Sequence, residues 1–374
     1  MVLKVIFWGS LGALAWTHAG YPAAAAALAR IRPRRVRKED VAPSVCLIVT
    51  AHNEEAVIGQ KLSNVLAFDY PADKLEVVVA SDASTDGTDA IIEEVAAREP
   101  RVRLLRCPRA GKVAAQNLAV TETSSEIVAF SDANSLWKPD ALRKLLRNFA
   151  DPDVAYVCGR LALESSNGAN REGVYWRYEL WTREQESRLG SITAGNGAIY
   201  AVRRSDYVME HRFGHDLGFP YLMVQRGRRA VYDPDAVAVE RPAAEPEDEL
   251  GRKVRIHARV WGHILTGRIL RPTDPLYMAQ LASHRLLRYS SGFLHLALLA
   301  SSIALVRRGP VYQGALAAQV AFLALAVAGR FRLRVPGASL AYYYTLVTAA
   351  TILGLARYLR SGTPLMWEKA EGTR

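Results

Sequence analysis

Cysteine is scarce in this chain, and two common nucleotide-binding motifs are missing from it. The 374 residues include only Cys46, Cys107 and Cys158, without C-x-x-C spacing. This pattern favours buried small hydrophobic side chains in a reducing compartment over a zinc site or a disulfide framework. No G-x-x-x-x-G-K-[ST] sequence is present and no G-x-G-x-x-G follows the first apolar run, so neither a P-loop nor a dinucleotide-binding loop is indicated.

Acidic and basic residues are absent from several long stretches. These are residues 5–29, 289–306, 311–329 and 336–356. Because a helix rises 1.5 Å per residue, each stretch is long enough, or for 289–306 nearly long enough, to cross a hydrocarbon core of about 30 Å. We expect a transmembrane anchor at residues 1–29, about three transmembrane helices within residues 289–359 and a C-terminal tail at residues 360–374.

The formal charge of +11 lies largely beside these apolar stretches, which disfavours nucleic acid as a partner. Six basic residues between 30 and 38 follow the first stretch directly, within a basic linker at residues 30–42. The positive-inside rule then places the polar domain that follows in the cytoplasm. A cleaved secretory signal is the alternative, and the dense basic flank argues against it. We predict a multi-pass protein of the cytoplasmic membrane, with the number of crossings left open.

Strand-like and helix-like segments alternate between residues 45 and 131. Apolar, β-branched runs at 45–50, 75–80, 102–106 and 126–131 predict strands, and the stretches at 54–66, 86–98 and 112–121 predict helices. Parallel neighbours need crossover connections of this length. We therefore predict an α/β fold with a doubly wound, mainly parallel sheet.

Polar residues follow several of these predicted strands. Asn53 and Glu54 come after the first, Asp82 after the second, and Asp132 with Asn134 after the fourth. In such sheets ligands bind outside the carboxyl ends of the strands. Acids at this edge would repel a phosphate unless a cation lay between them, so the pattern indicates Mg²⁺ or Mn²⁺ together with a nucleotide. The alternative for Asp132 alone is a turn cap.

Lys112 is a further candidate for the predicted nucleotide site. It follows Gly111 at the start of a predicted helix, where helix N–H groups would help it bind a phosphate. The alternative for Lys112 is a solvated lysine at a helix start.

Five ordered motifs within residues 43–245 resemble glycosyltransferase family 2, the inverting enzymes with the GT-A fold. VTAHNEE at 49–55 resembles the opening P-x-x-N-E stretch, with Thr50 where proline is common, and SDASTDGT at 81–88 resembles D-D-G-S-T-D-G-T. GKVAAQN at 111–117 resembles G-K-x-x-A-x-N, and Asp132-Ala133-Asn134 stands where the metal-binding D-x-D belongs. GNGAIYA at 195–201, with Gly197, resembles the later G-x-G-A-x-x-A strand.

The resemblance implies a role for each matching residue. Asp216 would be the general base that takes a proton from the acceptor hydroxyl, although His215 stands where the family usually has a second acid. Asp132, with Asn134 as a weaker neutral ligand, would hold the divalent cation. The nucleotide would be bound by Asn53, Glu54, Asp82, Lys112 and Gly197.

Residues 249–288 are expected to form amphipathic helices at the membrane interface. Val254, Ala258, Trp261 and Leu265 share one helical face, and Arg255 and Arg259 lie on a neighbouring basic face. We name Arg255, Arg259 and Trp261 as candidate acceptor or interface contacts. The Q-x-x-R-W motif of processive family members is absent here, which disfavours long-chain synthesis.

Three functions are compatible with this sequence. The favoured one is a membrane-bound transferase that moves one sugar from a nucleotide-sugar donor to a lipid-linked or cell-envelope acceptor. The second is a processive polysaccharide synthase that also secretes its product. The third is a non-catalytic binding or scaffold protein of the same fold, which the joint presence of Asp82, Asp132 and Asp216 disfavours.

Overall fold

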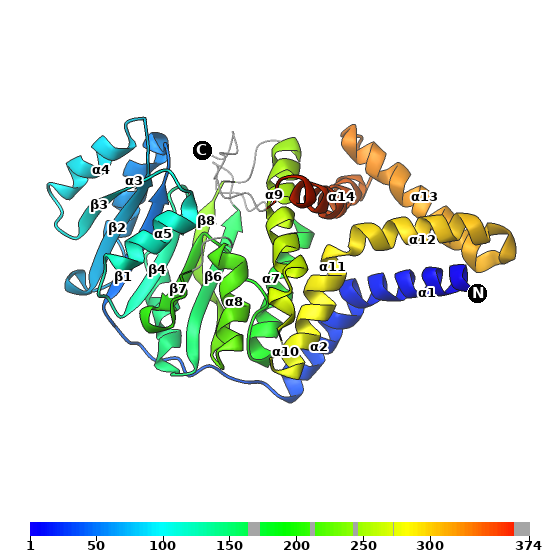
Figure 1. Cartoon of the computed structure of the whole chain (residues 1–374), viewed down its shortest axis with the longest axis horizontal. Helices are drawn as coiled ribbons and strands as arrows, with labels where there is room; N and C mark the ends of the chain where they lie inside the picture. The colour runs from blue at the N-terminus through cyan, green and yellow to red at the C-terminus, as the bar shows by residue number, and fades with distance from the viewer. Residues whose placement is uncertain (164–172, 210–213, 242–245, 272, 363–374) are drawn as a thin grey trace. The chain divides into compact units, whose positions relative to one another are not determined.

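The computed structural model describes residues 1–163, 173–209, 214–241, 246–271 and 273–362, except for the side chains of residues 216, 217, 246–249 and 270. The chain forms two compact units. The α/β unit draws on residues 25–244 and 271–277, and the helical unit on residues 1–24, 245–270 and 278–364. Figure 1 shows the elements of both.

One eight-stranded sheet forms the centre of the α/β unit, in the order β3-β2-β1-β4-β7-β6-β8-β5. The strands are β1 (Val45–Ala51), β2 (Leu75–Asp82), β3 (Val102–Cys107), β4 (Ile127–Asp132), β5 (Leu136–Trp137), β6 (Val154–Leu163), β7 (Ile199–Arg203) and β8 (Arg229–Glu240). The predicted strands within residues 45–131 are confirmed, and each ends one or two residues later than expected.

The sheet is mixed rather than parallel throughout. β3, β2, β1 and β4 pair in parallel, as do β6 and β8. β7 is antiparallel to both β4 and β6, and β5 is antiparallel to β8. The predicted mainly parallel sheet is therefore confirmed, and antiparallel β7 is the feature that the first half of the chain does not reveal.

Helices cover both faces of this sheet, which explains the continuous apolar strands. They are α3 (Glu55–Leu66), α4 (Thr88–Ala96), α5 (Lys112–Thr121), α6 (Ala141–Leu146), α7 (Val174–Leu189) and α8 (His215–Gln225). Side chains alternate along β1: Leu47 joins the core that includes Ile58 and Leu62 of α3, and Ile48 joins the core that includes Ala115 of α5.

The predicted basic linker is packed on the α/β unit. Arg34 N–H donates to the Arg188 carbonyl at 2.8 Å, and the Arg229 guanidinium donates to the Arg34 carbonyl at 2.8 Å. Arg34 also pairs with Asp153 at 3.0 Å. Part of the positive charge that the sequence places beside the membrane is thus engaged in contacts within this unit.

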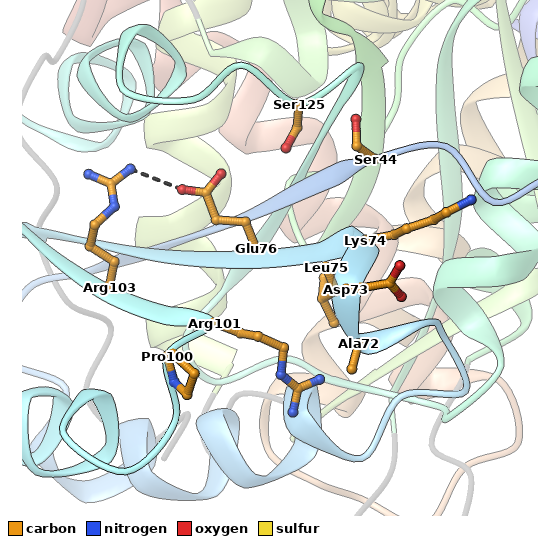
Figure 2. A pocket seen from close by; sticks show the side chains of 10 residues that line it. All are labelled: Ser44, Ala72, Asp73, Lys74, Leu75, Glu76, Pro100, Arg101, Arg103 and Ser125. Atoms are coloured by element: carbon orange, nitrogen blue, oxygen red, sulfur yellow. Dashed lines mark hydrogen bonds and ion pairs between the residues drawn. The ribbon is translucent and has the colours of Figure 1, made fainter.

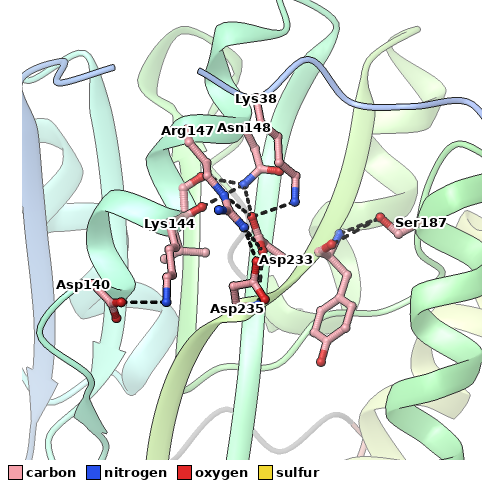
Figure 3. A network of polar contacts seen from close by, with 10 residues as sticks. Lys38, Asp140, Lys144, Arg147, Asn148, Ser187, Asp233 and Asp235 are labelled. Atoms are coloured by element: carbon pink, nitrogen blue, oxygen red, sulfur yellow. Dashed lines mark hydrogen bonds and ion pairs between the residues drawn. The ribbon is translucent and has the colours of Figure 1, made fainter. Parts of the chain in front are cut away.

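Asp233, fully buried on β8, is the centre of a polar network (Figure 3). Its carboxylate accepts from Lys38 at 3.0 Å, from two guanidinium nitrogens of Arg147 at 2.9 and 3.0 Å, and from Asn148 at 2.7 Å. Burial alone would raise the pKa of Asp233, but these donors outweigh it and lower that pKa. The carboxylate therefore stabilises the fold above its unfolded pKa of about 4, and this stability is lost as the pH falls through the folded value.

The helical unit contains α1 (Val2–Ala15), α9 (Pro246–Leu265), α12 (Ser291–Leu305), α13 (Pro310–Arg330) and α14 (Ala338–Ser361). Among the described residues, α13 and α14 are long and apolar enough to cross a membrane, and residues 275–308 would make a third span if their two helical parts, bent by 62°, count as one. The N-terminal segment is helical but is interrupted by a π-helical turn at Trp16–Gly20, so its role as an anchor stays a prediction.

Two π-helical turns contact each other within the helical unit. Trp16 Nε1 donates to Ser283 Oγ at 2.9 Å, and Thr17 Oγ1 donates to the Ser283 carbonyl at 2.7 Å, where Ser283 belongs to the π-helical turn Leu281–Leu286. A π-helical turn contains one extra residue, which disturbs the regular backbone hydrogen bonds of the helix. Here the side chains of Trp16 and Thr17 in one turn donate hydrogen bonds to Ser283 in the other. This contact joins segments more than 260 residues apart in the chain.

We predict that Asp233→Asn destabilises the α/β unit by about 2 kcal/mol, since it weakens charge-assisted hydrogen bonds at a buried position. The melting temperature of the detergent-solubilised protein should fall by about 4–8 °C. The control is Asp140→Asn, because Asp140 forms a partly exposed pair with Lys144 at 2.6 Å and its loss should change little. Equal melting temperatures for the two variants would contradict this account.

Candidate functional site

The loops after β1 and β2 are joined by hydrogen bonds at the carboxyl edge of the sheet. Asn53, with a left-handed φ of 56°, accepts at Oδ1 from Thr85 N–H at 2.7 Å, and its own N–H donates to Ser84 Oγ at 3.0 Å. Glu54 N–H donates to Thr88 Oγ1 at 2.7 Å, and its side chain is buried. Asn53 and Glu54 are therefore at the predicted edge, and in this structure they also order its loops.

Asp82 ends β2 and organises the turn that leads into α5. Its carboxylate accepts from the backbone N–H groups of Ala110 at 2.8 Å and Gly111 at 3.1 Å, and it contacts the Arg109 guanidinium. Gly111 has a φ of 91°, which a residue with a side chain rarely adopts. Asp82 is only 1% exposed. This carboxylate is thus engaged within the protein, and it fixes where α5 begins.

Lys112, the first residue of α5, meets Asp132 at the end of β4. The Lys112 ammonium contacts Asp132 Oδ1, and both side chains remain partly exposed. A Cβ added at Gly197 would lie 3.2 Å from Lys112 Nζ and 3.9 Å from Asp132 Oδ2. The structure therefore brings together three residues that the sequence named from separate motifs, and glycine at 197 leaves space beside them.

The oxygen donors at this point fit a hard divalent cation. Asp132 carries a carboxylate, and Asn134, two residues on in the same turn, carries an amide oxygen. Among the residues that the structure describes, no group of three or more His, Cys, Asp or Glu side chains forms a metal cluster. Mg²⁺ sites often use only one or two carboxylates and complete their shell with water and substrate phosphates, so a sparse set is compatible with such a cation.

His215, the first residue of α8, lies in a hydrogen-bonded aromatic cluster. Tyr207 donates its hydroxyl proton to Asn117 Oδ1 at 2.7 Å, so at its 3.2 Å contact with His215 Nε2 it must accept. Nε2 therefore carries the ring proton, and Nδ1 accepts from the Tyr200 hydroxyl at 3.1 Å. Gln116 Nε2 in turn donates to Tyr200 at 3.2 Å.

This chain of bonds connects the start of α8 to α5, the helix that begins at Lys112. Burial lowers the pKa of His215 to about 3, with a further contribution from the positive charge of Lys112, so the imidazole is neutral at physiological pH. Asp216 follows His215 on α8, but its side chain lies outside the described residues. The assignment of Asp216 as the general base therefore stays a prediction. His215, which stands where the family usually has a second acid, is a buried neutral side chain hydrogen-bonded to two tyrosines.

The predicted acceptor residues belong to α9 of the helical unit. Trp261 is buried and its Nε1 donates to the Thr351 carbonyl of α14 at 2.8 Å. Trp261 thus packs α9 against α14, and part of the predicted apolar face is covered inside the unit. Arg255 and Arg259 are partly exposed, and their predicted contact with acceptor or headgroups stays a prediction.

A cavity of about 360 Å³ lies elsewhere in the α/β unit (Figure 2). Its lining comes from the first residues of β2 and β3 and from the segments that precede β1, β2, β3 and β4, at the amino edge of the sheet rather than the carboxyl edge. The lining charges have partners, since Arg103 pairs with Glu76 at 3.1 Å and Lys74 donates to the Ala42 carbonyl at 2.8 Å. This cavity is separate from the Asp132 site.

Sequence reasoning missed Lys61, which is fully buried beside the Asp132 turn. Its Nζ donates to Ser131 Oγ at 2.7 Å. Burial lowers its pKa to about 7, against the opposing effect of the Asp132 charge. The available signal was its place in the predicted helix: Lys61 lies three residues after Ile58 and four before Val65, both of which are core residues.

The fold and this site define the α/β unit as a GT-A type domain. A solved mannosyltransferase from Pyrobaculum calidifontis, in complex with GDP-Man and Mn²⁺, has a TM-score of 0.74 to this chain at 24% identity, covering 96% of this chain and 99% of that chain. Residues 46–212 match the sequence profile of Glycosyl transferase family 2. This family match lies within the α/β unit and covers less than half of the chain.

Curated relatives share the same region. A beta-monoglucosyldiacylglycerol synthase from Synechocystis is 33% identical over 174 residues, which are 44% of this chain and 36% of that protein. An N-acetylglucosaminyltransferase from Rhizobium is 28% identical over 222 residues, which are 54% of this chain and 49% of that protein. The matched region is therefore half or less of the length of these relatives.

The neutral His215 gives a prediction for the dependence of stability on pH. Unfolding returns its pKa from about 3 to the ordinary 6.5, so the unfolded state binds the proton first and stability falls as the pH drops below 6.5. At pH 5 this single group should cost about 2 kcal/mol relative to neutral pH.

The measurement is the melting temperature of wild type and His215→Phe between pH 7.5 and 5. The variant has no ionisable ring at this position, so its melting temperature should fall less over this range. An identical pH dependence in the two proteins would refute the buried neutral imidazole. Tyr207→Phe, which keeps the histidine, serves as the matched control for loss of the hydrogen bond.

Proposed function

We propose that this protein is a membrane-bound inverting glycosyltransferase that moves single sugars from a nucleotide-sugar donor to a lipid-linked or cell-envelope acceptor. The observation that carries the proposal is the meeting of Lys112, Asp132 and Gly197 at the carboxyl edge of the sheet. The match of residues 46–212 to glycosyl transferase family 2 supports it, as do relatives named as a beta-monoglucosyldiacylglycerol synthase and an N-acetylglucosaminyltransferase.

The donor diphosphate would bind between the start of α5 and the Asp132 turn. Lys112 has an ammonium group at the first position of a ten-residue helix, whose free N–H groups favour an anion. Asp132 and Asn134 would hold Mg²⁺ or Mn²⁺, which when bound offsets negative charge on the departing nucleoside diphosphate. Lys112 would then bind phosphate oxygens in place of its contact with Asp132.

The nucleoside would lie against the loops after β1 and β2. Asn53 and Glu54 order the first of these loops, and Asp82 ends the second. For the Asp82 carboxylate to accept a bond from a base or ribose, the Arg109 guanidinium must move off it, whereas the bonds from Ala110 and Gly111 can remain. Asp82 therefore has a structural role and a proposed binding role.

Asp216 would accept the proton of the acceptor hydroxyl as that oxygen attacks the anomeric carbon, and the diphosphate leaves from the opposite face. His215 would hold the start of α8 while remaining neutral. The positive-inside pattern supports an active site on the cytoplasmic side of the membrane, and α13 and α14 are the helices suited to cross it. Arg255 and Arg259 would contact the acceptor or lipid headgroups.

The donor is tested first by thermal shift of the full-length protein with UDP, GDP and their sugars, each with and without Mn²⁺. A ligand that binds only the native state raises the melting temperature, by an amount set by its concentration relative to Kd. Transfer is then measured with the stabilising sugar nucleotide and a lipid extract. Products extended by one sugar support the proposal, and a ladder of long products would identify a processive synthase instead.

Asp132→Ala should lower the transfer rate at least 100-fold and abolish the Mn²⁺-dependent part of the thermal shift, because the carboxylate is the main cation ligand. Lys112→Met should weaken nucleoside diphosphate binding about tenfold, the effect of one charge-assisted bond. Asp140→Ala is the control, as a partly exposed acid on the same unit. Wild-type transfer by Asp132→Ala would overturn the metal assignment.

Asp216→Asn separates binding from chemistry. It should keep the melting-temperature increase caused by the donor nucleotide and lower kcat by about 100-fold or more, since general base catalysis contributes roughly 10²–10⁴-fold. The measurement is kcat at saturating donor together with the thermal shift. A variant that retained wild-type kcat would exclude Asp216 as the base.

A further inference from the structure

Lys61 lies in the second turn of α3 with no exposed surface. Lysine is almost never fully buried unless its ammonium group has partners. Ile58 and Val65, three residues before and four residues after Lys61 on the same helical face, are apolar members of the core. An apolar side chain would satisfy this environment better if packing were the only requirement, so the position of the lysine needs a chemical reason.

The partners of Lys61 lie on either side of the proposed cation ligands. Nζ donates to Ser131 Oγ at 2.7 Å and to the Ser135 carbonyl at 2.5 Å, and these two residues flank the Asp132-Ala133-Asn134 turn. Nζ also lies 5.4 Å from the centre of the Trp137 ring, close enough for a cation–π contact. One ammonium group therefore joins the residue before the turn to the residue after it.

The same residues are tied to the strand that carries Gly197. The Ala198 carbonyl accepts from Trp137 Nε1 at 2.9 Å, from Ser131 Oγ at 3.3 Å and from Ser135 Oγ at 3.4 Å. Within the turn, Ser135 N–H donates to the Asp132 carbonyl at 3.2 Å. Lys61 is thus part of a hydrogen-bond network around the Asp132–Asn134 turn. The network holds the backbone of this turn next to the strand that follows Gly197.

A side chain of the same length without N–H donors would leave this set incomplete. Lys61 Nζ donates to a hydroxyl and to a carbonyl and lies against an aromatic ring. Among the described residues no carboxylate forms an ion pair with Lys61, so its bonds act on the turn itself rather than on a partner acid. Outer groups that orient the ligands of a cation commonly change its affinity by 10–100-fold when removed.

We propose that Lys61 is a positioning residue that holds the Asp132–Asn134 turn in its cation-binding conformation. The inference rests on the proposed function, because it requires Asp132 and Asn134 to be the cation ligands. Lys61 does not contact the substrate in this account. It acts through Ser131 and Ser135, so its loss should weaken cation binding more than it weakens donor binding.

The experiment compares full-length wild type with Lys61→Met in detergent. Mn²⁺ is titrated in the presence of UDP or of GDP, whichever stabilises the wild type, and bound Mn²⁺ is measured by loss of the free-ion electron paramagnetic resonance signal. We expect the Kd for Mn²⁺ to rise about tenfold or more. At saturating Mn²⁺, the KM for the donor should stay within about threefold of wild type.

Leu62→Ala is the matched control, since Leu62 is the adjacent, fully buried core residue of α3 and makes no contact with the turn through hydrogen bonds. It should lower the melting temperature without changing the Kd for Mn²⁺. Ser131→Ala keeps Lys61 and removes one of its acceptors, so it should raise that Kd in the same direction as Lys61→Met. It also provides the test if Lys61→Met does not fold.

A Kd for Mn²⁺ equal to wild type in both Lys61→Met and Ser131→Ala would overturn the inference, even if both proteins melt at lower temperature. Failure of the proposed function gives a different result, because the wild type itself would then bind no Mn²⁺ with either nucleotide and transfer no sugar.

Discussion

The carboxylate of Asp82 is the contact on which the arrangement of the site depends. It accepts hydrogen bonds from the backbone N–H groups of Ala110 and Gly111. These bonds fix the turn that starts α5, in which Gly111 has a positive φ. The start of α5 determines where Lys112 lies, and α5 in turn supplies Gln116 and Asn117 to the tyrosines that bind His215. One buried acid at the end of β2 thereby positions groups on both helices that border the site.

Two lysines, Lys112 and Lys61, lie near Asp132 in different environments. Lys112 approaches the Asp132 carboxylate from the partly exposed side, where a diphosphate would bind, and Lys61 lies on the buried side, where it holds the backbone of the turn. In the proposed function, the same residue type would bind ligand on one side and hold the conformation of the turn on the other. Exposure is the difference: one ammonium can exchange partners with solvent and substrate, and the other cannot.

The sequence predicted most of the first half of the sheet, because buried parallel strands are continuous apolar runs and the polar residues that follow them mark the carboxyl edge. Asp132, Lys112 and Gly197 could be named from motifs, but their meeting could not, because it depends on β7 pairing antiparallel with β4. Lys61 was missed because a lysine in an amphipathic helix is usually on its solvated face. The partners of His215, Tyr200 and Tyr207, are in turn bonded to α5, and no local sequence pattern indicates these contacts.

The pairing of β7 with β4 also has a consequence for how the family domain can vary. Ile199 lies opposite Ser131, so the chain between the two strands leaves and returns at the same point of the sheet. Both ends of this segment are held in place by the pairing of β4 with β7. Its connecting loops could change in length without moving Asp132 or Gly197, since loop-closure cost rises only slowly with length, whereas β6 pairs with β7 and must stay in register. This topology lets those loops diverge while the carboxyl edge of the sheet is kept.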